Sequence, residues 1–173
     1  MNSSEGLKRL LYSRFLHFSH LTEQLFAIES EEFADFARLE GLSSFPTNLT
    51  SVHTIDCIGH YEPINNTSIA EKMNLSKASI TKISTKLLEE GYIKRSQMND
   101  NKKEVYFSLT PKGRQIFEVH ARMHVIIENR FIDSMNDFSE SELQAVLKFF
   151  QMIIQHKEKI ANGEGEHGKR EGE

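Results

Sequence analysis

The chain has 173 residues, of which 38% are hydrophobic and 27% charged, with a formal net charge of -4 at pH 7. This content suits one domain with appendages and a packed core, and no apolar run approaches the roughly 20 residues of a membrane-spanning helix. A single cysteine excludes an intramolecular disulfide and the N-terminus lacks a signal pattern, so we expect a cytoplasmic protein without membrane association.

A long amphipathic helix is predicted at the start of the chain. Apolar residues between Leu7 and Ile28 recur at three- and four-residue steps, which indicates one buried helix face. The pattern can continue until Gly41 ends it. A second helix is predicted over residues 50–61, with Thr50 as its N-terminal cap.

A helix-turn-helix pattern follows. Thr67 can cap a helix over residues 68–73, and Ser76 can cap another over residues 77–90. Only a two-residue turn separates these helices, which is typical of a helix-turn-helix unit.

Two strands are predicted behind this pair of helices, over residues 92–95 and 104–109, around a polar tip at residues 99–103. Between Lys72 and Lys103 there are eight basic residues against three acidic ones. The positive charge of this acidic chain is therefore concentrated on the helix-turn-helix and its hairpin.

Two further helices are predicted in the C-terminal part. Thr110 can cap the first, with Pro111 as its first residue. Ser139 and Glu142 form a capping box that opens the second, which carries a strong apolar stripe. Residues 162–173 are rich in Gly and Glu and are predicted to be a disordered tail.

The predicted fold class is mainly α with a small β-hairpin: a winged helix-turn-helix domain flanked by N- and C-terminal dimerisation helices. The apolar faces of the flanking helices are wider than a small winged-helix core can cover, which indicates a homodimer. Two-fold symmetry also suits DNA half-sites about one helical turn, ~34 Å, apart. The predicted segments are an N-terminal dimerisation helix and loop (1–47), a DNA-binding domain (48–110), C-terminal dimerisation helices (111–161) and the tail (162–173).

Double-stranded DNA is the predicted partner. If Ile69 and Met73 pack against Ile80, the short polar and basic side chains of the second helix point outward, where they can reach base edges and phosphates. Taken alone, the hairpin could equally be a solvated charged loop. The candidate DNA-binding residues are Thr67, Ser68, Lys77, Ser79, Thr81, Lys82, Lys86, Arg95, Asp100, Lys102 and Lys103.

The segment from Leu49 to about Ile154 resembles the MarR (multiple antibiotic resistance regulator) family of transcription regulators. The resemblance is carried by Ser68-Ile69-Ala70, the run from Leu87 to Arg95, and Leu109-Thr110-Pro111-Lys112-Gly113. It implies a dimer built from the terminal helices, a pseudo-palindromic operator and usually repression. The family's wing carries Asp-x-Arg, whereas this chain has Asp100-Asn101-Lys102, and lysine cannot bind bidentately.

Histidines suggest an effector site. Residues 53–59 and 120–124 resemble a subgroup that includes streptococcal fatty-acid-synthesis repressors, and the paired histidines are similar to those of zinc-sensing members. His120 and His124, one turn apart, could bind zinc together with His53. A small organic effector, or a structural cluster of histidines, is the alternative. The candidate effector residues are His53, Cys57, Ile116, His120, Met123 and His124, and the candidate metal ligands are His120, His124 and His53.

The sequence permits one other class of function and argues against a second. The lysine-only wing and the net negative charge would permit a winged-helix module that binds proteins without specific DNA binding. An enzyme is not expected, because the sequence has no nucleophile elbow, phosphate loop or paired-carboxylate motif.

Overall fold

The computed structural model describes residues 3–98 and 101–161, and the predicted tail lies outside this part. The chain forms two compact units, Met1–Ile126 and Ile127–Glu173, and the boundary falls within one helix. No helix in the described ranges is long and apolar enough to cross a membrane. The elements are α1 (Ser3–Leu39), α2 (Leu49–Tyr61), β1 (Ile64–Asn65), α3 (Asn66–Met73), α4 (Lys77–Glu89), β2 (Ile93–Met98), β3 (Asn101–Leu109), α5 (Pro111–Asp133) and α6 (Glu140–Ala161).

Helix α1 is as long as predicted and ends at the predicted glycine. Gly41 has a φ of 80°, a left-handed conformation that a residue with a side chain rarely adopts. The N–H of Leu42 donates to the carbonyl of Ala37 at 3.0 Å, which closes the end of the helix. Near this end Phe33 and Ala37 are buried in the core, whereas Leu11 and other apolar residues of the first turns are exposed.

The caps of α2 and α3 differ from the predicted ones. Asn48 and Asn65 hold these positions, and the side chain of each accepts a hydrogen bond from the backbone N–H three residues on. The predictions of Thr50 and Thr67 as caps are therefore wrong, since both lie inside the first turn. Asparagine ranks above threonine as an N-cap, and each helix begins at the earlier and better acceptor.

The turn between α3 and α4 is as predicted. Asn74 has a φ of 51° and ends α3 in the left-handed conformation. Ser76 begins α4, because its hydroxyl oxygen accepts the N–H of Ser79 at 3.1 Å. Ile69 and Ile80, from the two helices, are both fully buried in the core.

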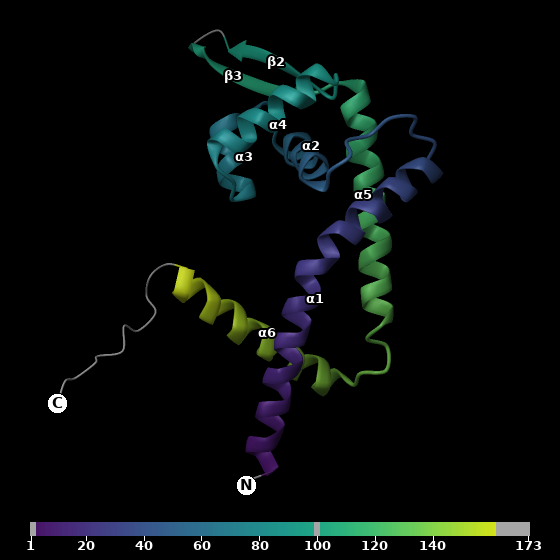
Figure 1. Ribbon diagram of the computed structural model, residues 1–173, viewed down its shortest axis with the longest axis vertical. Helices are drawn as coiled ribbons and strands as arrows, with labels where there is room; N and C mark the ends of the chain where they lie inside the picture. The colour runs from purple at the N-terminus through teal and green to yellow at the C-terminus, as the bar shows by residue number, and fades with distance from the viewer. Residues whose placement is uncertain (1–2, 99–100, 162–173) are drawn as a thin grey trace, which may run out of the picture. The chain divides into compact units, whose positions relative to one another are not determined.

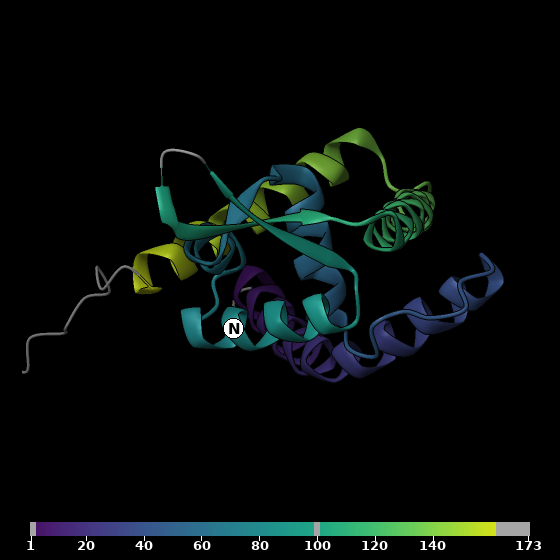
Figure 2. The ribbon, with the colours of Figure 1, turned by 90° about the horizontal axis from the view of Figure 1, so that it is seen from above.

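A three-stranded antiparallel sheet completes the winged domain. Strand β3 lies between β1 and β2, with Ile64 opposite Phe107 on one side and Ile93 opposite Leu109 on the other. Both hairpin strands are longer than predicted. The two-residue strand β1 was missed, because so short a segment shows no alternation. Helices α2 and α4 both contact the sheet (Figures 1 and 2).

Helix α5 begins as predicted. The Thr110 hydroxyl oxygen accepts the N–H of Gly113 at 3.1 Å and donates to the carbonyl of Gly91 at 2.7 Å. The first turn of α5 is thereby bonded to the turn that follows α4. Gly113 is buried there against the backbone of Tyr92, and a Cβ atom at this position would overlap the Tyr92 carbonyl oxygen.

Replacing Gly113 by alanine is expected to destabilise the protein by about 1–3 kcal/mol, because backbone rather than a flexible side chain must move to make room. Urea unfolding measures this change. Gln115→Ala, an exposed position on the same helix, is the control and should stay within about 0.5 kcal/mol of the wild type. Equal stability of the two variants would contradict the close approach.

In the second unit, α6 shows the predicted capping contact. The N–H and the hydroxyl of Ser139 donate to the Glu142 carboxylate at 2.8 and 2.6 Å, and these bonds lower the pKa of Glu142. Leu147, Phe150 and Ile154 are 58%, 43% and 54% exposed. Their spacing places them on one face of the helix.

Candidate nucleic-acid interface and histidine cluster

Helix α4 has one buried and one exposed face. Ile80, Ser84 and Leu87 are buried, and their spacing defines the inner face. The candidate DNA-binding residues of α4, all exposed, are Lys77, Ser79, Thr81, Lys82 and Lys86. Thr67 and Ser68, at the start of α3, are half-buried.

A polar network joins α3 to α4. The hydroxyl of Ser84, a side chain only 1% exposed, donates to Oδ1 of Asn66 at 2.9 Å. The amide Nδ2 of Asn66 donates to Oγ1 of Thr81 at 3.4 Å, and the Thr81 hydroxyl donates to the Lys77 carbonyl at 2.8 Å. Sequence reasoning missed Asn66 and Ser84, whose residue types alone do not show that they meet.

The wing is the hairpin formed by β2 and β3, and a side-chain contact of β3 joins it to the start of α3. The Glu104 carboxylate of β3 accepts hydrogen bonds from the side chains of Asn65 and Tyr106, and the contact with Glu104 raises the pKa of Tyr106. Arg95 on β2 is exposed. Asp100 lies outside the described residues, as do the side chains of Lys102 and Lys103, whose backbone belongs to β3.

Three histidines from two helices come together as predicted. Ligand nitrogens of His53 on α2 and of His120 and His124 on α5 all lie within 4.8 Å of one another. The Nε2 atoms of His120 and His124 are 3.1 Å apart. His120 is 3% exposed, and its Nδ1 lies 3.3 Å from Oδ1 of Asp56, a partner that sequence reasoning missed.

Burial and neighbouring histidines lower the pKa of two members of the cluster, His53 and His124. Burial, followed by the proximity of the other histidines, lowers the pKa of His53. Burial and His120 likewise lower the pKa of His124. Burial alone would raise the pKa of Asp56, but hydrogen bonding from His120 and nearby histidine charge outweigh it and the pKa is lowered. The lowered pKa values of His53 and His124 favour their neutral imidazole forms, in which one ring nitrogen carries a free lone pair.

The other candidate effector residues belong to the core around this cluster. Cys57, Ile116 and Met123 are all buried. Burial raises the pKa of the Cys57 thiol, which favours the unreactive protonated form over a redox sensor.

Comparison with known proteins identifies the family. A family model described as the MarR family matches residues 47–105. The chain is also 47% identical over 150 residues to the HTH-type transcriptional regulator PchR of Bacillus subtilis strain 168, covering 87% of this chain and 89% of that protein. The chain belongs to the MarR family.

Solved structures of MarR proteins have the same fold. Streptococcus pneumoniae FabT in complex with DNA matches with a TM-score of 0.68 at 24% identity, over 86% of this chain and 99% of that one. Lactococcus lactis ZitR in complex with DNA matches with a TM-score of 0.58 at 27% identity, over 66% and 77%. The MarR family and these relatives are DNA-binding transcription regulators, so this chain is a regulator and not an enzyme.

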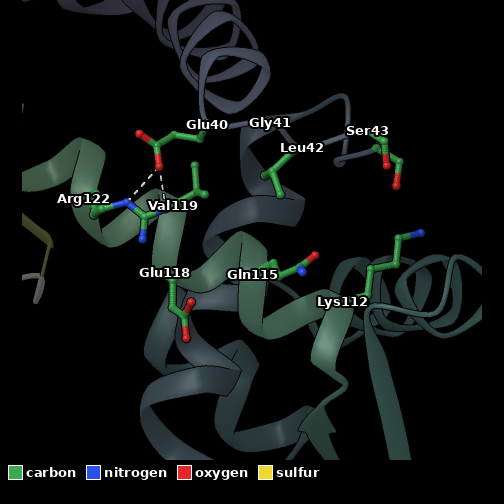
Figure 3. A pocket seen from close by; sticks show the side chains of 10 residues that line it. Glu40, Gly41, Leu42, Ser43, Lys112, Gln115, Glu118, Val119 and Arg122 are labelled. Carbon is green, nitrogen blue, oxygen red and sulfur yellow. Dashed lines mark hydrogen bonds and ion pairs between the residues drawn. The ribbon is translucent and has the colours of Figure 1, made fainter.

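A separate polar pocket of this MarR chain lies between the turn after α1 and one face of α5 (Figure 3). Its volume is about 460 Å³. Glu40 and Arg122 form an ion pair across one side, with Nε and Nη2 at 3.0 and 2.6 Å from Oε2 (Figure 3). None of the six candidate effector residues lines this pocket.

Proposed function

We propose that this chain is a homodimeric repressor that acts in the cytoplasm, binds a pseudo-palindromic operator and responds to an effector at the histidine cluster. The observation that carries the DNA-binding part is the exposed basic face of α4, fixed by the buried face behind it. In this proposal α4 enters the major groove and residues 48–110 form the DNA-binding domain. Arg95, Lys102 and Lys103 contact the flanking backbone.

Dimerisation is proposed for residues 1–47 and 111–161. Large apolar side chains are exposed on α1, including Leu7, Leu11 and Phe18, and on α6, including Leu147 and Phe150. Exposed apolar helix faces of this kind mark association sites. A second copy of the chain is the partner that gives the two-fold symmetry of a palindromic operator.

Selection of bound duplexes from a random DNA pool tests the proposal directly. A recovered inverted repeat with half-sites about 10 base pairs apart would support a symmetric dimer on DNA. Salt supplies the second test, since binding that falls steeply with ionic strength indicates phosphate contacts. A pool from which no sequence is enriched would contradict the proposal.

A transition metal is one effector that the cluster can accept. Three imidazoles form a donor set that zinc, copper and nickel favour. Asp56 accepts from Nδ1 of His120, which leaves Nε2 as the ligand atom, in the manner of the carboxylates that orient metal-binding histidines. A small organic effector beside Ile116 and Met123 is the alternative occupant. Either effector would act by binding with different affinity to the conformation of the dimer that binds DNA and to the conformation that does not.

Calorimetry with zinc alone distinguishes the two effectors. We expect zinc to bind the wild type and to lose most of its affinity for the His120→Ala, His124→Ala variant. Since protons compete for the imidazoles, affinity should fall as the pH drops below about 6.5. His17→Ala, His20→Ala, a pair on α1 outside the cluster, serves as the control. If zinc binds all three proteins equally, or binds none of them, the hypothesis of a metal effector is wrong.

A further inference from the structure

The exposed face of α4 is lined by methyl groups rather than by free hydroxyl donors. Ala78, Thr81 and Thr85 are exposed and lie at three- and four-residue steps, so they form one stripe along the helix. We refer to these three residues as the methyl stripe. Lys77 and Lys82 lie on its two sides, and the buried Ile80 and Leu87 lie opposite.

The threonine hydroxyls of this stripe are engaged within the protein. The Thr85 hydroxyl donates to the Thr81 carbonyl at 2.8 Å, as the Thr81 hydroxyl does to the Lys77 carbonyl. Asn66 also faces the Thr81 oxygen at 3.4 Å, from α3. Each hydroxyl has a single proton to donate, so it cannot serve a base acceptor while this bond holds. The γ-methyl group of each threonine takes part in no such bond and is the apolar group that these exposed side chains can present to DNA.

From this arrangement we infer that the methyl stripe of α4 reads thymine through its C5-methyl group. This inference rests on the proposed function, in which α4 lies in the major groove. There the thymine methyl is the apolar feature of the base edges, and alanine and threonine methyls are suited to contact it. The flanking lysines hold the helix to the phosphates, whereas the methyl stripe selects A·T pairs within each half-site.

Two substitutions distinguish recognition by the methyl group of Thr81 from recognition by its hydroxyl. Thr81→Val keeps the branched shape and its methyl groups but removes the hydroxyl. Thr81→Ser keeps the hydroxyl and removes the methyl group. Recognition by the methyl group and recognition by the hydroxyl therefore predict opposite outcomes for these two substitutions at one exposed position.

The experiment uses the full chain and the duplex recovered by selection from a random pool. Thymines of the half-site are replaced one at a time by uracil, which lacks only the C5-methyl group. The wild type should lose about fourfold in affinity for each contacted methyl, equivalent to ~0.8 kcal/mol. Thr81→Val should bind within about twofold of the wild type and keep this discrimination, because it retains the methyl group that contacts thymine. Thr81→Ser removes this contact from both subunits, so it should lose about sixteenfold and no longer distinguish uracil at one position of each half-site.

Controls separate this inference from the proposed function. Thr22→Ser on α1, whose hydroxyl makes a similar local bond to the Ser19 carbonyl at 2.7 Å, should leave the discrimination intact. Tight binding that is indifferent to every uracil would overturn the thymine reading and leave DNA binding standing. Loss of binding by Thr81→Val, with Thr81→Ser unchanged, would assign recognition to the hydroxyl and also overturn it. Failure to enrich any duplex would overturn the proposed function and this inference together.

Discussion

The Lys77→Ala, Lys82→Ala variant is expected to bind its operator on the order of a thousandfold more weakly than the wild type. Both lysines are exposed beside the methyl stripe of α4. A dimer loses four charge-assisted contacts through this change, each worth about 1 kcal/mol or more. The slope of log affinity against log salt should become shallower by about 3 to 4, since each phosphate contact contributes about 0.9.

Fluorescence anisotropy over a series of salt concentrations measures both quantities. The matched control is Lys148→Ala, Lys157→Ala, which removes the same charge from exposed positions on α6. If the effect were only one of net charge, the two variants would lose affinity equally. An unchanged slope for the α4 variant would show that these lysines do not contact phosphates.

Replacing Leu147 and Phe150 by glutamate should convert the dimer into a monomer. Both side chains are exposed on one face of α6, and each dimer would have to bury four carboxylates at its interface. Burying an unpaired charge costs several kcal/mol per group, so association should weaken by at least a thousandfold. Light scattering at micromolar concentration should change from twice the 20.0 kDa chain mass to the chain mass itself.

The same variant should also lose operator binding, because a single recognition helix reads only one half-site. Lys148→Glu is the control, since it changes the net charge by the same two units at a position off the apolar face of α6. This control should remain a dimer. A variant with both glutamates that still has the dimer mass would place the interface elsewhere.

Local signals in the sequence were sufficient for the main elements of the fold. Ser76 and Thr110 act as caps where predicted, and Gly41 ends α1 where predicted. These features could be read because a cap or a left-handed turn depends on a few adjacent residues. The helix-turn-helix and its hairpin followed from the same kind of signal, together with the alternation of apolar residues.

The predicted caps of α2 and α3 were wrong because asparagine caps a helix better than threonine, and at α3 a contact with a distant strand adds to this preference. Asn48 and Asn65 displaced Thr50 and Thr67, and Asn65 also bonds to Glu104 on the distant strand β3. Strand β1 likewise exists because β3 offers it a hydrogen-bonding edge. Such outcomes depend on segments far apart in the chain.

The chemistry of both candidate sites was determined by the sequence in part only. Residue types and helix periodicity placed His120 beside His124 and turned Thr81 outward. Only the tertiary structure brought His53 and Asp56 to that pair, and Asn66 and Ser84 to the base of α4. Spacing along one helix predicts which residues share a face, whereas the direction of a hydroxyl or an imidazole nitrogen depends on the partner across the helix packing.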